Sequence, residues 1–258
     1  MSLLNNLEIE EIITKNKPNS SSFIFRHLPP TMGITLGNSL RRILLGHISG
    51  IAPLGVEISD KNGPVKSKDT ILAGVDKVTR YLIMSLKEII LEEKNKKEGI
   101  FCLELNIENQ KKEERIIVAG DFQPDPSVEI KNPEFPLATL APLASLKIKL
   151  YCQKNWGYHE EETQKKDYFA EKENVIVLAT DYSPIKGGQV NFQVEQEVIG
   201  LDKQEEKLTI TINTNGAIKP KKALQEALEI SQNSFELINK TLTNGRKKGK
   251  MAKELATK

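Results

Sequence analysis

The spacing of apolar residues changes several times along the chain. Near both ends, apolar and polar residues alternate with a period of two, which is typical of strands with one buried face. The predicted strands there cover residues 7–15, 22–28, 190–194 and 208–212. Asn215-Gly216 follows the last of them and is a strong turn signal. Antiparallel strands are therefore expected at both ends of the sequence.

Two further segments repeat their apolar residues at the helical period. One helix is expected at 35–48, with Thr35 as its N-cap, and another at 220–240, where Pro220 suits the first helical position. The two apolar stripes contain Leu36, Leu40, Ile43 and Leu44 in the first helix, and Leu224, Leu228 and Phe235 in the second. From the residues alone, the simplest interpretation is that each stripe covers its own sheet.

The middle of the chain, residues 50–180, is rich in short predicted strands and contains one convincing helix at 76–91. Its polar run at 159–173 has no apolar period, so we expect a mobile loop. The segment 241–258 is basic and also lacks an apolar period, so we expect a disordered tail. Together these elements predict an α+β fold.

Composition and charge narrow the class of protein. The chain has 258 residues, of which 38% are hydrophobic and 28% are charged, and its net charge is only +2. These values fit a soluble globular protein and argue against a dedicated nucleic-acid binder. No stretch approaches the roughly 18 consecutive apolar residues of a membrane helix, and the N-terminus lacks the pattern of a signal peptide. We therefore expect a protein that stays in the compartment where it is made.

The residues that could carry chemistry form no recognisable site. Cys102 and Cys152 are too far apart in sequence for a Cys-x-x-Cys motif, and both are expected to be reduced, buried thiols. No histidine has neighbours that resemble a catalytic triad. Gly33-x-x-x-Gly37 lacks the Gly-Lys-Ser/Thr ending of a phosphate loop, and no aspartate-rich cluster could hold the magnesium ions of nucleotidyl transfer. The sequence predicts no catalytic residue, metal or cofactor.

One block is specific enough to indicate a family. Residues 32–45 read MGITLGNSLRRILL. This block resembles the signature of bacterial RNA polymerase alpha subunits, Gly-x-Thr-Leu-Gly-Asn-x-Leu-Arg-Arg-x-Leu-Leu. Weaker matches follow in family order at residues 82–87, 132–140, 182–195 and 207–224. The resemblance covers residues 22–240, and the C-terminal domain of the family has no counterpart in this sequence.

The resemblance implies a particular domain organisation. A discontinuous dimerisation domain, made of an antiparallel sheet and two long helices, would comprise residues 1–49 and 181–240. A strand-rich α+β domain would be inserted at 50–180. Two copies of the chain would then pair through a four-helix layer. Its implied core is Leu36, Leu40, Ile43, Leu44, Leu224, Leu228 and Phe235.

The resemblance also implies partners. The homodimer would be a non-catalytic scaffold that assembles the beta and beta-prime type subunits of DNA-directed RNA polymerase, and it would meet DNA only through the assembled enzyme. The implied contacts with a large subunit are Arg41, Arg42, Leu45 and Lys87. The implied location is the bacterial cytoplasm or the plastid stroma, away from membranes.

Some positions depart from the family pattern. Asn155-Trp156-Gly157-Tyr158 stands where the family has Gly-Arg-Gly-Tyr, and Lys221 and Lys222 replace acidic residues at the start of the second helix. Two alternatives stay open at this point. One is an archaeal- or eukaryotic-type polymerase assembly subunit, and the other is a stand-alone nucleic-acid-binding protein.

Overall fold

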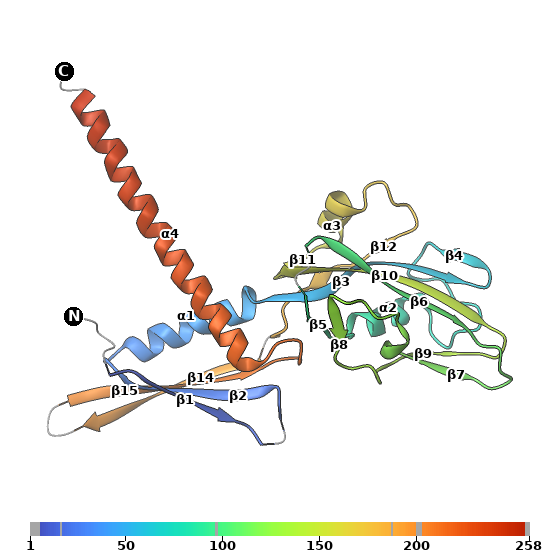
Figure 1. Cartoon of the computed structure of the whole chain (residues 1–258), viewed down its shortest axis with the longest axis horizontal. Coiled ribbons are helices and arrows are strands. Elements are labelled where there is room, and N and C mark those ends of the chain that lie inside the picture. The colour runs from blue at the N-terminus through green and yellow to red at the C-terminus, as the bar shows by residue number, and fades with distance from the viewer. Residues whose placement is uncertain (1–5, 16, 96–97, 187, 200–202, 256–258) are drawn as a thin grey trace. The chain divides into compact units, whose positions relative to one another are not determined.

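The computed structural model describes residues 6–15, 17–95, 98–186, 188–199 and 203–255. The chain divides into two compact units. Unit 1 contains residues 1–47, 187–213 and 220–258, and unit 2 contains residues 48–186 and 214–219. The sequence of unit 2 thus interrupts that of unit 1, whose elements carry the blue and the orange-to-red colours of the two chain ends in Figure 1.

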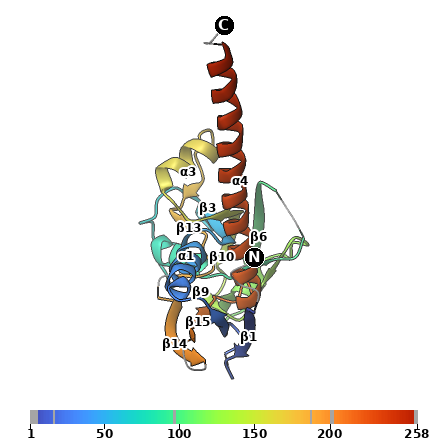
Figure 2. The same cartoon turned by 90° about the vertical axis from the view of Figure 1, so that its left-hand side faces the viewer.

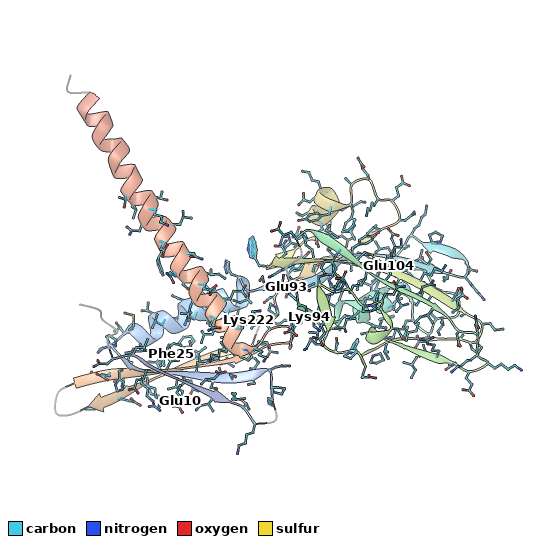
Figure 3. The ribbon with its side chains drawn as sticks, in the orientation of Figure 1. Glu10, Phe25, Glu93, Lys94, Glu104 and Lys222 are labelled. Atoms are coloured by element: carbon cyan, nitrogen blue, oxygen red, sulfur yellow. The ribbon has the colours of Figure 1, made fainter. Side chains whose placement is uncertain are left out.

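Unit 1 is built on a four-stranded antiparallel sheet with the strand order β1-β2-β15-β14. The strands are β1 (Glu8–Ile13), β2 (Ser20–Leu28), β14 (Val190–Ile199) and β15 (Lys203–Asn213). Pairing of Ile210 with Phe23 joins the two ends of the sequence at the centre of this sheet. The side chains alternate as predicted: Phe25 is buried on the face that the helices cover, and Glu10 lies on the opposite face (Figure 3).

Two helices, α1 (Met32–Gly46) and α4 (Pro220–Leu255), lie on the same face of this sheet (Figure 1). Helix α1 contacts β14, β15 and α4, and α4 also contacts β2. α1 begins at Met32, before the predicted start. Thr35 is therefore no N-cap; it lies inside the helix, and its hydroxyl donates a hydrogen bond to the carbonyl oxygen of Thr31 at 3.1 Å.

Helix α4 is longer than the sequence predicted. It continues to Leu255, whereas a disordered tail was expected over 241–258; residues 256–258 lie outside the described part. Continuing an existing helix is much less costly than starting one. The segment beyond residue 245 is rich in Lys and also contains Arg, Met, Ala, Glu and Leu, which are good helix formers even without an apolar period. Figure 2 shows α4 as one continuous helix.

Unit 2 is built on a seven-stranded sheet, whose main path runs β6-β10-β3-β5-β8, with β4 and β12 paired to β3. These strands are β3 (Ser49–Asp60), β4 (Gly63–Val65), β5 (Leu91–Glu93), β6 (Ile100–Glu108), β8 (Val128–Ile130), β10 (Ser145–Trp156) and β12 (Ile176–Val177). The remaining elements are α2 (Thr79–Lys87), β7 (Arg115–Val118), η1 (Ala119–Asp121), β9 (Pro136–Leu140), β11 (Tyr158–His159), α3 (Glu161–Tyr168) and β13 (Thr180–Asp181). The α+β fold class is confirmed in both units.

Helix α3 corrects the prediction of a loop at 159–173. A polar residue, not an apolar stripe, holds this helix. The Gln164 side chain is buried; its amide nitrogen donates to the carbonyl oxygen of Leu178 at 2.5 Å, and the Tyr182 hydroxyl donates to its amide oxygen at 2.9 Å. Because hydrogen bonds anchor the helix, no hydrophobic period marks it in the sequence.

Candidate assembly surfaces

The N-terminus of α1 is held by a carboxylate from a distant part of the sequence. Thr31 precedes the helix with a left-handed backbone, at φ 73°, and its side chain makes no cap. Instead, the N–H groups of Thr31 and Gly33 donate hydrogen bonds of 2.8 Å to the two carboxylate oxygens of Glu206 on β15. Glu206 is buried, and its negative charge suits the positive end of the helix dipole. One side chain thus anchors α1 to the sheet.

Two glycines let α1 approach the sheet closely. A Cβ added to Gly33 would lie 2.9 Å from both Glu206 and Val194, and a Cβ added to Gly37 would lie 2.5 Å from the ring of Phe192. Contacts this short would force the helix away from β14 and β15. The glycines of the block at 32–45 therefore have a packing role.

Some residues of the apolar stripe of α1 lie in the core of unit 1, and others are only half-buried. Leu40 and Leu44 are only 3% and 0% exposed. They pack into the chain's own core. Their predicted contact with a second copy stays a prediction. Leu36 and Ile43 are half-buried at the flank of the helix. Helical spacing could not distinguish the two groups, because both sets are apolar and only the position of the sheet separates them.

The stripe of α4 runs from the core to the surface. Leu224 is buried, as is Ala227, whereas Leu228 is 41% and Phe235 is 71% exposed. The same face continues with Ile238 and Leu242, which are 56% and 64% exposed. We call Leu228, Phe235, Ile238 and Leu242 the α4 stripe. Unlike Leu224, its members have little cover from their own chain.

The two adjacent arginines of α1 have different environments. The Nε of Arg41 donates a hydrogen bond of 3.1 Å to the carbonyl oxygen of Val190, the first residue of the edge strand β14. Arg42 is exposed, because successive helical residues point about 100° apart. Leu45 is half-buried. Of the predicted large-subunit contacts on α1, Arg42 is therefore the most accessible, and Arg41 helps to hold the sheet edge.

Lys87, the fourth predicted contact, is the last residue of α2 in unit 2. Burial lowers the pKa of Lys87, and repulsion from Lys68 and Lys186 lowers it further. Nearby Glu88 and Asp181 offset part of this effect. The ammonium form of Lys87 is therefore less favoured than that of an ordinary exposed lysine.

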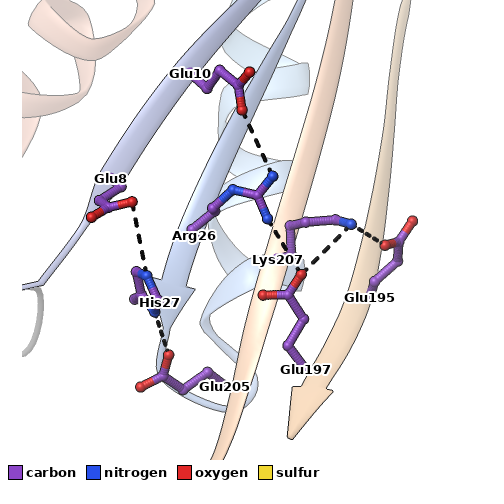
Figure 4. Close-up of polar contacts among 8 residues, drawn as sticks. All are labelled: Glu8, Glu10, Arg26, His27, Glu195, Glu197, Glu205 and Lys207. Carbon is purple, nitrogen blue, oxygen red and sulfur yellow. Dashed lines mark hydrogen bonds and ion pairs between the residues drawn. The ribbon is translucent and has the colours of Figure 1, made fainter. Parts of the chain in front are cut away.

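The opposite face of the unit 1 sheet carries charged side chains. Figure 4 shows Arg26, His27 and Lys207, each between two carboxylates. The Nδ1 atom of His27 lies 2.6 Å from a carboxylate oxygen of Glu205. Most of these contacts join neighbouring strands, whereas Arg26–Glu197 joins β2 to β14 across β15. The exposed ion pairs among them stabilise a fold only slightly. The contacts of His27 in this network are therefore structural.

Chemical sites are not apparent in the described ranges. They contain no cluster of three or more His, Cys, Asp or Glu residues that could hold a metal ion. No helix in this part of the chain is both long and apolar enough to span a bilayer. Cys152 is buried as predicted, but Cys102 is half-buried, because it lies on the edge strand β6 and points to the side opposite its buried neighbours Phe101 and Leu103.

Comparison with known proteins decides the family. Residues 30–235 match the profile described as the RNA polymerase Rpb3/Rpb11 dimerisation domain. Over 236 residues, the chain is 32% identical to the DNA-directed RNA polymerase subunit alpha of Desulforamulus reducens; the match covers 90% of this chain and 70% of the relative. The chain belongs to the RNA polymerase alpha subunit family.

Membership of the alpha subunit family confirms the resemblance seen in the block at 32–45. It also makes the chain a scaffold subunit of RNA polymerase. Sequence reasoning missed Glu206, the residue that anchors the helix carrying this block. No local signal marks it, because the N–H groups that it binds lie 175 and 173 positions away.

Proposed function

We propose that two copies of this chain form the homodimer on which the beta and beta-prime type large subunits of DNA-directed RNA polymerase assemble. The observation that carries the proposal is the exposure of Leu228 and Phe235 in a segment that matches a dimerisation domain. Contiguous exposed apolar side chains usually mark an interface. In this proposal the large subunits carry out nucleotidyl transfer, and the present chain organises them.

The dimer surface consists of apolar positions that unit 1 leaves uncovered. Leu36 and Ile43 lie at the flank of α1, and Leu228 and Phe235 lie on α4, which contacts α1. A two-fold axis would bring the same four positions from each copy together. Obligate homodimers of this kind bury on the order of 2,000 Å² or more, largely apolar.

The large-subunit contact consists of Arg42 with Leu45 on α1. A planar guanidinium can form paired hydrogen bonds with a carboxylate, which a lysine cannot reproduce. Lys87 offers a further contact on unit 2. Because burial and like charges disfavour its ammonium form, a partner carboxylate would relieve an existing electrostatic cost. The chain contacts DNA only as part of the assembled enzyme. That enzyme works in the bacterial cytoplasm or the plastid stroma.

The decisive experiment purifies the tagged full-length chain from its source. We expect a dimer by sedimentation equilibrium at micromolar concentration and the co-purification of two very large chains. A lone monomer that retains neither chain would refute the proposal. A salt titration of duplex DNA binding by the isolated protein tests the stand-alone nucleic-acid alternative, which requires binding that weakens steeply with salt.

A further inference from the structure

The turn between β9 and β10 holds a leucine in a backbone conformation that suits glycine. The N–H of Ala144 donates a hydrogen bond of 3.3 Å to the carbonyl oxygen of Ala141, and this bond closes a four-residue turn. Pro142 and Leu143 are its central residues. The φ of Leu143 is 61°, and its side chain is 80% exposed. A positive φ at the third position of such a turn selects glycine or asparagine, because other side chains are strained there.

Two neighbouring segments fix this backbone conformation. The carbonyl oxygen of Asn109 accepts the N–H of Leu143 at 2.9 Å. The Asn109 side chain is buried, and its nitrogen donates to the carbonyl oxygens of Leu140 and Ala141 at 3.2 and 3.1 Å. The N–H of Ala141 in turn donates to the carbonyl oxygen of Gly74 at 2.8 Å. A strained conformation persists only where its surroundings over-determine it, so this turn is rigid.

The leucine contributes little to the fold in return for this strain. Two other non-glycine residues in the described part of the chain have a positive φ, namely His27 and Thr31. Both lie where a buried carboxylate of β15 binds them, Glu205 at 2.6 Å and Glu206 at 2.8 Å. The aliphatic side chain of Leu143 makes no hydrogen bond and is mostly in solvent. The strain therefore secures only the position of an exposed apolar group, and strained residues of this kind cluster at functional sites.

We infer that Leu143 is an anchor residue, which fills an apolar pocket on one of the large polypeptides that this chain assembles. The inference rests on the proposed function and adds a contact in unit 2. Two observations select this partner. The proposed dimer surface consists of unit 1 positions, so it leaves the turn to another polypeptide. Helix α2, which ends at the proposed large-subunit contact Lys87, contacts β9, and β9 leads directly into the turn.

The rigidity of the turn favours this role. A side chain on a fixed backbone loses little freedom when it binds, so more of its burial contributes to affinity. Burying a leucine side chain fully is worth at least about a tenfold change in a dissociation constant. A partner surface with an apolar pocket of the size of one leucine therefore suits this turn.

Variants at position 143 distinguish a contact residue from a residue that the fold needs. Leu143→Gly removes both the strain and the apolar side chain, so this variant should unfold at no lower urea concentration than the unmodified chain. Its capture of the large chains should be at least about tenfold weaker. The matched control is Leu143→Met, which keeps an apolar side chain of similar size, and its capture should stay within about twofold.

Competition measures the capture. Each tagged variant is produced in its source together with the untagged, unmodified chain. The ratio of the two chains in the purified enzyme is then compared with their ratio in the whole extract. Sedimentation equilibrium of each purified variant should show the same dimer as the unmodified chain.

Four other outcomes would overturn the anchor role while the proposed function stands. Full capture of Leu143→Gly would show that no large chain binds the leucine, and a less stable Leu143→Gly would show that the leucine serves the fold. Equal loss of capture in Leu143→Met would show that the partner does not recognise an apolar side chain. A monomeric Leu143→Gly would show that a second copy covers the turn. If the unmodified chain captures no large chain, the proposed function fails, and the anchor role fails with it.

Discussion

The carboxylate of Glu206 lies 2.8 Å from the backbone nitrogen of Gly33, and a Cβ at Gly33 would come within 2.9 Å of the same carboxylate. The helix N-terminus and its cap are thus fitted to each other. The side chain provides the charge and the acceptors, and the glycine provides the space. Loss of either should loosen the first turn of α1.

Replacing Glu206 with alanine should destabilise unit 1. The N–H groups of Thr31 and Gly33 would lose their acceptors, and a buried unsatisfied donor costs about 1–3 kcal/mol. We expect a lower midpoint in urea unfolding. Glu195→Ala is the matched control, because it removes a carboxylate that pairs with Lys207 at the surface, where ion pairs contribute about 0–1 kcal/mol. Equal midpoints for both variants would contradict the anchoring role of Glu206.

A methyl group at position 37 should be harmful, although alanine usually favours helices. In Gly37→Ala the Cβ would lie 2.5 Å from the ring of Phe192, and overpacking of this kind costs about 1–3 kcal/mol. Gly46→Ala is the control, because nothing lies within 4 Å of the added Cβ. It should be neutral or slightly stabilising. Thermal unfolding distinguishes the two variants, and Phe192→Leu should partly rescue Gly37→Ala. A Gly37→Ala protein as stable as the parent would show that α1 can shift freely.

Replacing Arg41 should affect the stability of unit 1, whereas replacing Arg42 should affect assembly with the large subunit. Arg42→Ala leaves the described contacts of unit 1 intact, so we expect a normal dimer that captures its large subunit more weakly by about 2–5 kcal/mol. Arg41→Ala loses the hydrogen bond to Val190 and should lower the stability of unit 1 by about 1 kcal/mol. Quantitative co-purification and urea unfolding measure the two effects. Full capture by the Arg42 variant would remove this residue from the proposed contact.

Cys102 should react with iodoacetamide more slowly than its partial exposure suggests. Burial, and then the nearby Glu104, raises the pKa of Cys102 from 9.0 to about 11. At pH 8 its thiolate fraction is then about a hundredfold lower than that of a free thiol, and the thiolate is the reactive species. Iodoacetamide labelling of the native protein should be slow, and labelling after unfolding should be fast. Rapid native labelling at pH 8 would contradict the raised pKa.

The same pKa shift predicts a dependence of stability on pH. Between about pH 9 and pH 11, the unfolded thiol loses its proton while the folded thiol keeps it. The free energy of unfolding should therefore fall as the pH rises through this window. Cys102→Ser should flatten that part of the profile. Burial also raises the pKa of Cys152, so part of the slope should remain in this variant.

Local patterns in the sequence predicted where the helices and strands lie better than they predicted what each side chain packs against. Alternation identified β2 and β15, and the helical period identified α1 and α4, because one-sided burial produces both patterns. The block at 32–45 indicated the family, which the comparisons confirmed. The same periodicity could not show that Leu44 faces the chain's own core while Phe235 is exposed. That distinction depends on where the sheet ends.

Non-local interactions explain what the sequence did not predict. Thr35 was predicted as the N-cap because local capping residues are the usual solution, yet a glutamate on β15 makes the cap. Helix α3 depends on the buried hydrogen bonds of Gln164, which leave no apolar stripe to detect. The helical extension of α4 follows from propagation of a helix that starts far upstream. In the first two cases a residue outside the helix supplies the missing interaction.

The insertion of unit 2 within unit 1 affects how the chain folds during synthesis. Strand β2 and helix α1 leave the ribosome early, but their central partner β15 and the carboxylate that anchors α1 are translated only after all but a few residues of unit 2. Domains generally fold as units as they emerge, and closing such long loops is slow. Unit 2 can therefore fold while the first segment of unit 1 still lacks its partners. A chain whose translation stops before residue 206 would carry a helix α1 without its anchor, and nascent incomplete chains would be kept from pairing too early.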